Sequence, residues 1–217
     1  MDIEQARFNM IEQQIRPADV LDPATLETLS LVRRERFVSP VLQALAFAEI
    51  ELPVGCGQHM LSPQVEAKVL QALNLRRGDS ALEIGCGSGY MAALLAMRAG
   101  QVHSLEIESV LVGLARENLQ RAGVDNVVVV EADGFGGWAE AAPYDVIVAS
   151  GAVPEIPQAW LDQLKIGGRL FAFVGKGPVM EGRLVTRVSG TDCRSLNVFE
   201  TTVTPLRLKG EKAPFVL

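Results

Sequence analysis

The sequence predicts an α/β protein built on a doubly wound, mostly parallel sheet of the Rossmann-like kind, with a helical extension before it and antiparallel strands after it. From residue 79 onward, short apolar runs alternate with amphipathic helical segments, an order that requires parallel strands joined by crossovers. A glycine-rich turn, GCGSG at 85–89, follows the first of these runs. Two extended segments, 182–190 and 195–206, come last and have no helix between them, which predicts antiparallel additions.

The composition is that of a globular protein, with 48% hydrophobic and 21% charged residues among 217. The longest apolar runs, such as MAALLAM at 91–97, are far too short to span a membrane, and the N-terminus lacks the pattern of a secretory signal. We therefore expect no membrane partner and a cytoplasmic location. Cys56, Cys86 and Cys193 are widely separated and there are two histidines, so we expect neither disulfides nor a metal site.

The net charge of −6 argues against a protein that grips nucleic acid through its phosphates, so we expect no nucleic-acid partner. The segment RRER at 33–36 is the one candidate for a local basic patch. We interpret it instead as a solvated helix end.

The first 62 residues are expected to form a helical extension and a substrate loop. Apolar residues at helical spacing predict a helix from Ile3 that ends at Pro17. Asp22 then has the pattern of an N-cap, with proline at the first position of a second helix. Residues 37–62 are interpreted as a winding connector. Ser62 and Pro63 open a third helix, and residues 63–217 form the cofactor-binding core of a single domain.

The core contains five predicted strands, which lie within the stretches SALEI, VHSLEI, NVVVVEA, YDVIVA and GRLFAFVG. Helices are predicted after the glycine turn, over 108–122 and within IPQAWLDQL. In such a sheet, ligands bind beyond the carboxyl ends of the strands, near the point where the strand order reverses. The glycine turn is expected at that point, where missing side chains allow a close approach to a ligand.

The pattern of the turn excludes two phosphate-binding motifs. The dinucleotide fingerprint requires glycine at position 90, which is tyrosine here. A P-loop requires Gly-Lys-Ser/Thr after the turn, and these residues are absent. The ligand of the turn is thus expected to be neither a dinucleotide nor an isolated phosphate group.

With Glu83 before it, the turn resembles the first motif of class I methyltransferases that use S-adenosyl-L-methionine. Glu106 ends the next strand, 21 residues after Gly85, where a carboxylate can accept hydrogen bonds from ribose hydroxyls. Asp133-Gly134 ends the third strand and resembles the motif that meets the adenine. Other interpretations stay open: Glu106 as a solvated strand end, Asp133 as the cap of a turn, and Cys86 as a small filler residue.

Over nearly its whole length the chain resembles protein-L-isoaspartate O-methyltransferases. The resemblance rests on ordered motifs that include MIEQQIRPADVLD, LPVGCGQHMLSP, LEIGCGSGYMAALLA, DNVVVVEADGFGGW and APYDVIVASGA. It implies transfer of a methyl group to the carboxylate of L-isoaspartyl residues in damaged proteins or peptides. The ester then collapses to a succinimide, which reopens partly as normal aspartate. Both a monomer and a homodimer remain open.

The resemblance assigns two sets of site residues. The cofactor is expected on residues at three strand ends: Glu83, Gly85, Cys86, Gly87, Ser88 and Gly89, then Glu106 and Ile107, then Asp133 and Gly134. The acceptor is expected on His59, Met60, Leu61 and Ser62. Because a carboxylate is already ionised at neutral pH, the reaction needs alignment and no general base.

The acceptor loop departs from the family. Its usual pattern is Gly-Gln-Thr-Ile-Ser-Gln-Pro, whereas residues 57–63 here are GQHMLSP. Leu61 occupies the position of the family's serine, so we assign the missing polar contact to Ser62 and His59. The alternatives are that Ser62 is a helix N-cap and His59 a plain loop residue. Because of this departure, a relative with another acceptor is a rival hypothesis. A non-catalytic cofactor-binding module is a third hypothesis, from a different class of function.

Overall fold

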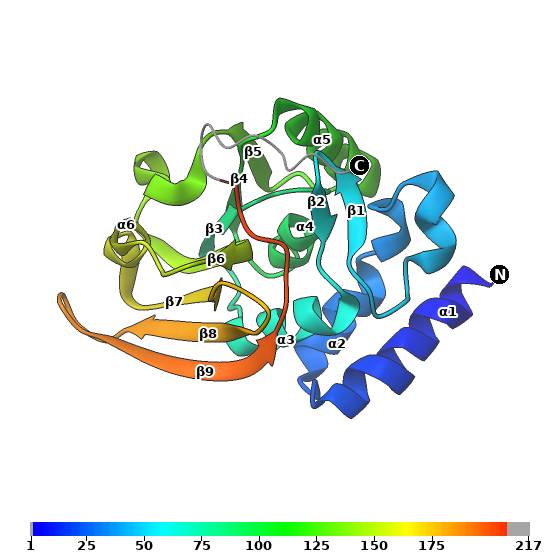
Figure 1. The fold of residues 1–217 in the computed structure, drawn as a ribbon, viewed down its shortest axis with the longest axis horizontal. Helices are drawn as coiled ribbons and strands as arrows, with labels where there is room; N and C mark the ends of the chain where they lie inside the picture. Colours follow the sequence, from blue (N-terminus) through cyan, green and yellow to red (C-terminus); the bar gives the residue numbers. More distant parts are fainter. Residues whose placement is uncertain (1, 208–217) are drawn as a thin grey trace.

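The computed structural model describes residues 2–207, which fold around a central sheet (Figure 1). Within this part of the chain, seven strands form the sheet in the order β5-β4-β3-β6-β7-β8-β9. The first five are parallel, and β8 and β9 are antiparallel additions. The predicted fold class is confirmed. The strands are β3 Ser80–Ile84, β4 Gln101–Glu106, β5 Val127–Glu131, β6 Tyr144–Val153, β7 Leu164–Val174, β8 Met180–Arg187 and β9 Cys193–Thr201.

The parallel strands are buried on both faces because their side chains alternate between two apolar clusters. On β6, Val146 and Val148 join one cluster, and Ile147 and Ala149 join the other. The first cluster packs beneath α3 Pro63–Leu73, α4 Tyr90–Ala96 and α5 Ser109–Ala122, and the second beneath α6 Gln158–Asp162. Strand order reverses between β3 and β6, so the glycine turn lies at the switch point, as predicted.

The N-terminal helices share the first cluster with the sheet. They are α1 Ile3–Met10, the π-helical η1 Ile11–Ile15, the 3₁₀ turn η2 Arg16–Ala18, and α2 Pro23–Leu31. Asp22 caps α2 as predicted, because its carboxylate accepts the backbone N–H of Thr25 at 2.8 Å. None of the helices in residues 2–207 combines the length and apolar character that crossing a membrane requires.

The expectation of a plain winding connector over 37–62 is wrong. After the 3₁₀ helices η3 Arg34–Arg36 and η4 Pro40–Leu45, the chain forms an antiparallel hairpin of β1 Leu52–Gly55 and β2 Gln58–Met60. Its two-residue turn has Cys56 at φ 53° and Gly57 at φ 70°, the left-handed conformation of a hairpin turn. The hairpin lies beside the C-terminal segment in Figure 1.

After β9, the chain returns along the switch point instead of continuing as an edge strand. Pro205 forms a parallel bridge with Ala152 of β6. The backbone N–H of Ala152 donates to the carbonyl of Thr204 at 3.1 Å, and the N–H of Leu206 donates to the carbonyl of Ala152 at 2.9 Å. This C-terminal segment, residues 203–207, lies over the carboxyl ends of the central strands.

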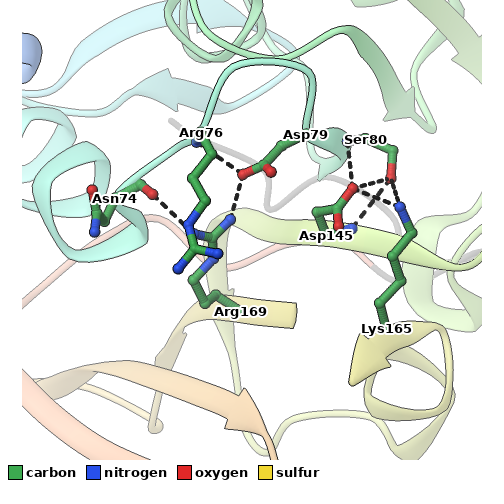
Figure 2. A network of polar contacts seen from close by, with 7 residues as sticks. All are labelled: Asn74, Arg76, Asp79, Ser80, Asp145, Lys165 and Arg169. Atoms are coloured by element: carbon green, nitrogen blue, oxygen red, sulfur yellow. Dashed lines mark hydrogen bonds and ion pairs between the residues drawn. The ribbon is translucent and has the colours of Figure 1, made fainter. Parts of the chain in front are cut away.

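The amino ends of the same strands carry a separate polar network (Figure 2). The Lys165 ammonium donates to the Asp145 carboxylate at 2.6 Å, and the Ser80 hydroxyl donates to the same oxygen at 2.9 Å. Burial alone would raise the pKa of Asp145, but the hydrogen bonds from Lys165 and Ser80 outweigh it and hold the pKa below its ordinary value of 3.8.

Replacing Asp145 with Asn should lower the free energy of unfolding at pH 7 by about 0.5–1 kcal/mol, because the ion pair with half-exposed Lys165 is lost. A depressed carboxyl pKa stabilises the fold above the ordinary value of 3.8, and that contribution disappears as pH falls through the lower folded-state pKa. Urea unfolding at pH 7 and in acid measures this difference. The exposed Asp125→Asn serves as the control, and a D145N deficit that is independent of pH would contradict the assignment.

Candidate functional site

The glycine turn is fixed to the end of β4 by backbone hydrogen bonds. The N–H groups of Gly85 and Cys86 both donate to the carbonyl of Leu105, at 2.9 and 3.0 Å. The next N–H, of Gly87, donates to the carboxylate of Glu106 at 2.9 Å. Two neighbouring strand ends thereby become one rigid edge.

Glu106 is a buried, oriented carboxylate and not a solvated strand end. It is 6% exposed, and besides Gly87 it accepts the backbone N–H groups of Ile107 at 2.9 Å and Glu108 at 3.1 Å. These donors account for three of about four acceptor positions on a carboxylate, which leaves capacity for a ligand hydroxyl. The group therefore suits a neutral hydroxylated ligand at this edge.

A hollow opens beside this carboxylate. Gly85 and Gly134 line it from two different strand ends, and neither has room for a side chain. A Cβ atom on Gly85 would lie 2.6 Å from Leu206 Cδ2, and one on Gly134 would lie 2.4 Å from Ile84 Cγ2. The remaining walls combine apolar and polar groups: Gln58, Leu105, Glu106, Ile107, Ala132, Phe135, Leu206 and Arg207.

Asp133 is placed next to this hollow but is not one of its lining residues. Its carboxylate accepts the backbone N–H of Phe135 at 3.1 Å and caps the short 3₁₀ helix η5, Gly134–Gly136. At the third strand end, the residues that line the hollow are instead Ala132, Gly134 and Phe135. The capping role was the alternative that the sequence left open.

A second hollow also has Gly85 in its lining and is bordered by residues 59–61 of the acceptor loop. Glu83 at its base is fully buried and accepts the hydroxyls of Ser104 and Ser150. Burial raises the pKa of Glu83 to about 8, although these two hydrogen bonds oppose the shift. The lining comprises His59, Met60, Leu61, Glu66, Glu83, Gly85, Cys86, Gly87, Ser88, Tyr90, Met91 and Ser150.

The predicted acceptor residues differ in burial and in hydrogen bonding. Met60 and Leu61 are buried at 5% and 4% exposure, so they form apolar walls. Ser62 is the N-cap residue of α3 but makes no side-chain cap; its hydroxyl donates to Glu49, whose carboxylate accepts the N–H of Gln64 instead. His59 is exposed and lines the hollow.

Buried Arg34 holds the acceptor loop from behind. Its guanidinium donates to the carbonyls of Leu61 at 2.6 Å and Ala46 at 2.8 Å, and it pairs with Glu66 of α3. Burial raises the pKa of Glu66, and the charge and hydrogen bond of Arg34 oppose this shift and favour the ionised carboxylate. The interpretation of residues 33–36 as a solvated helix end is therefore wrong for Arg34 and Glu35, which are buried in ion pairs with Glu66 and Arg7.

The C-terminal segment supplies site residues that the sequence did not reveal. Leu206 packs against Gly85 and Gly151, and Arg207 pairs with Glu108 and donates to the carbonyl of Cys56 in the hairpin turn. Ser150 and Phe135 were also missed. Phe135 follows Asp133-Gly134 directly and could have been found from that motif, whereas Leu206 and Arg207 lie more than 95 residues from Glu108 and carry no local signal.

Cys86 contributes its backbone N–H to the turn and a buried thiol to the wall of the second hollow. Burial raises the pKa of the Cys86 thiol well above its usual value, which makes it a poor nucleophile at neutral pH. In residues 2–207, no group of three His, Cys, Asp or Glu side chains is arranged to hold a metal ion. The filler interpretation of Cys86 agrees with its burial.

Comparison with known proteins decides the family. Residues 5–199 match the family model described as protein-L-isoaspartate(D-aspartate) O-methyltransferase. The chain belongs to this family. It is 40% identical over 202 residues to protein-L-isoaspartate O-methyltransferase 1 of Rhodopseudomonas palustris, covering 92% of this chain and 82% of the relative. It is 45% identical over 169 residues to the Methanoculleus marisnigri protein of the same family name, covering 78% and 77%.

Solved structures agree with the fold of this family. A protein-L-isoaspartate O-methyltransferase superposes with a TM-score of 0.80 at 25% identity and covers 97% of this chain and 67% of its own. A putative family protein from Plasmodium falciparum, solved in complex with S-adenosyl-L-homocysteine, has a TM-score of 0.81 at 18% identity, with 95% and 99% coverage. The latter likeness supports the fold.

Two glycine-to-alanine changes, one in the turn and one in α5, should have opposite effects on the free energy of unfolding. Gly85→Ala should lower the free energy of unfolding by about 1–3 kcal/mol, because φ is +90° there and Leu206 occupies the Cβ position. Gly113→Ala, on the exposed side of α5 with nothing within 4 Å, should raise it by about 0.5–1 kcal/mol. Denaturant unfolding measures both, and equal effects would show that the turn is not constrained as described.

Proposed function

We propose that this chain is an S-adenosyl-L-methionine-dependent methyltransferase that esterifies the carboxylate of L-isoaspartyl residues in damaged proteins and peptides. The observation that carries the proposal is the meeting of two hollows at Gly85, one beside Glu106 and one lined by the acceptor loop, in a chain of this family. We place this activity in the cytoplasm, because Cys56, Cys86 and Cys193 are all free thiols, as a reducing compartment favours.

The residues present fit the cofactor. The first hollow offers glycine backbone for close approach, apolar walls at Ile107 and Phe135 for a flat base, and the Glu106 carboxylate for sugar hydroxyls. Ala132, Gly134 and Phe135 would border the adenine, and Gly85, Gly87 and Ser88 the methionine end. When bound, S-adenosyl-L-methionine supplies a methyl group already activated by its positive sulfur.

The protein's own task is alignment. An isoaspartyl carboxylate is ionised at neutral pH, so no side chain has to remove a proton from it. The rigid edge formed by the glycine turn and Glu106 fixes one reactant, and the acceptor loop fixes the other. Holding two reactants in reacting geometry supplies several kcal/mol of the barrier, and about 7–11 kcal/mol in the best intramolecular models.

Leu61 favours a second candidate function, a methyltransferase with a different acceptor. Its side chain is buried and cannot hydrogen-bond, and the neighbouring Ser62 hydroxyl is bonded to Glu49. A carboxylate entering the hollow would find no hydroxyl donor at either position. The acceptor must therefore be tested directly.

The purified chain should transfer a labelled methyl group to an L-isoaspartyl peptide and not to the aspartyl peptide of the same sequence. The reason is that the isoaspartyl carboxylate sits on a side chain one methylene shorter, so a fixed loop can discriminate between them. Methyl incorporation into the paired peptides measures this preference. Equal labelling of both, or labelling of neither, would favour the second candidate.

Glu106→Gln should weaken binding of S-adenosyl-L-homocysteine by about 10- to 100-fold, because hydrogen bonds to a charged acceptor contribute about 1.5–3 kcal/mol. Glu131→Gln is the matched control, since Glu131 pairs with Glu106 across β4 and β5 but is exposed. Titration calorimetry measures both variants. Unchanged binding by E106Q would remove Glu106 from the cofactor site.

A further inference from the structure

A hydrogen-bonded chain of three side chains joins the hairpin to the C-terminal segment. His59 lies on β2, Glu51 directly precedes β1, and Thr204 lies in the C-terminal segment. The Thr204 hydroxyl is 3.0 Å from the Glu51 carboxylate and 3.1 Å from Nδ1 of His59. The backbone N–H of Thr204 also donates to Glu51, at 3.4 Å, so the carboxylate holds Thr204 at two points.

The chemistry of the three groups determines which group donates each hydrogen bond. An ionised carboxylate can only accept, so the single hydroxyl hydrogen of Thr204 is donated to Glu51. The hydroxyl oxygen then accepts, and its donor must be Nδ1–H of His59. The imidazole is thereby held as the Nδ1–H form, and Nε2 is the nitrogen left for a ligand. A second proton on Nε2 turns the ring into a charged donor.

This imidazole lines the acceptor hollow, which is otherwise poor in positive charge. Glu66 of α3 and Glu83 of β3 line the same hollow, and Glu49 lies beside it on Ser62. The nearby guanidinium groups are engaged elsewhere: Arg34 pairs with Glu66, and Arg207 pairs with Glu108. A carboxylate entering here would be stabilised by a cationic donor, and His59 is the exposed lining residue that can supply one.

We propose that Glu51, Thr204 and His59 act as a unit that presents a protonated imidazole to the acceptor carboxylate, in place of the hydroxyl that Leu61 lacks. Glu51 and Thr204 are positioning residues, and His59 is the substrate contact. Glu51 fixes the orientation of the ring through Thr204. The assignment rests on the proposed function, because it requires an anionic acceptor.

The first test is the pH dependence of kcat/KM with an L-isoaspartyl peptide. For the wild-type chain it should fall as pH rises through the imidazole range, about pH 5–8, because the charged donor is lost. His59→Gln should abolish this fall, and Thr204→Val and Glu51→Gln should make it shallower, because the ring is no longer held toward the acceptor. At pH 7, H59Q should reduce kcat/KM by about 10- to 100-fold, the size of one charge-assisted hydrogen bond, and the two positioning variants should reduce it less.

Matched variants separate positioning from folding. Thr204→Ser keeps the hydroxyl and should restore the wild-type pH profile. Thr202→Val removes an exposed hydroxyl that donates to the carbonyl of Pro178, away from the hollow, and should leave the profile unchanged. If T204V lowers kcat/KM equally at every pH, Thr204 is merely structural and the proposal is overturned. A rate that rises with pH would make His59 a base and overturn it as well.

A second measurement needs no activity. Long-range ¹H–¹⁵N NMR of ¹⁵N-labelled protein should show the Nδ1–H form for neutral His59, identified by the signal absent in H59Q, with His103 as the internal reference. In T204V the population should move toward the Nε2–H form. If neutral His59 is already Nε2–H in the wild type, the chain of hydrogen bonds does not exist.

Failure of the proposed function and failure of the Glu51–Thr204–His59 unit would give different results. A wild-type chain that never methylates the isoaspartyl peptide contradicts the proposed function, while the NMR result still judges the Glu51–Thr204–His59 unit. An active wild-type chain whose pH profile is unaffected by H59Q and T204V contradicts the unit and leaves the function in place.

Discussion

The structure depends on one constraint, the attachment of the glycine turn to the end of β4. The carbonyl of Leu105 and the carboxylate of Glu106 together accept three successive backbone N–H groups, from Gly85, Cys86 and Gly87. Only a backbone that turns sharply can direct three consecutive donors to one neighbouring strand, and all three glycines of the turn have positive φ. The same turn separates the two hollows, so its geometry sets where a cofactor and an acceptor can meet.

The two segments that cover this edge of the sheet lie far apart in the sequence. The hairpin 52–60 and the C-terminal segment 203–207 are tied together by Glu51, Thr204 and His59 and again by Arg207. Arg34, behind the loop, connects the N-terminal extension to Leu61 and α3. Breaking such a buried ion pair is costly because it leaves one charge uncompensated, so the pair can hold the acceptor loop in a fixed position.

The core could be predicted from the sequence because its signals are local. Alternation of apolar strands and amphipathic helices specified the sheet, and the Asp22-Pro23 pair specified a helix start. The hairpin was missed because its turn places Cys56, and not Asn or Asp, in the left-handed conformation. Burial of Arg34 and Glu35 could not be predicted, since charged residues are buried only when distant partners such as Glu66 and Arg7 neutralise them.

The candidate site likewise has residues that could be predicted from the sequence and residues that could not. Glu106 was singled out by strand-end logic, and its burial argues against the alternative of a solvated strand end. The Asp133 carboxylate accepts a hydrogen bond from Phe135, and the Ser62 hydroxyl donates one to Glu49. These bonds within the protein engage polar groups that a motif alone assigns to ligands. The contribution of residues 203–207 is a long-range contact, which no window of sequence reveals.

A crystal structure of the chain with S-adenosyl-L-homocysteine tests the central claim most directly. We expect the ribose hydroxyls on the Glu106 carboxylate, the base between Ile107 and Phe135, and the sulfur directed past Gly85 toward residues 59–61. A ligand seated away from the glycine turn, or one whose sulfur faces away from the acceptor loop, would contradict it.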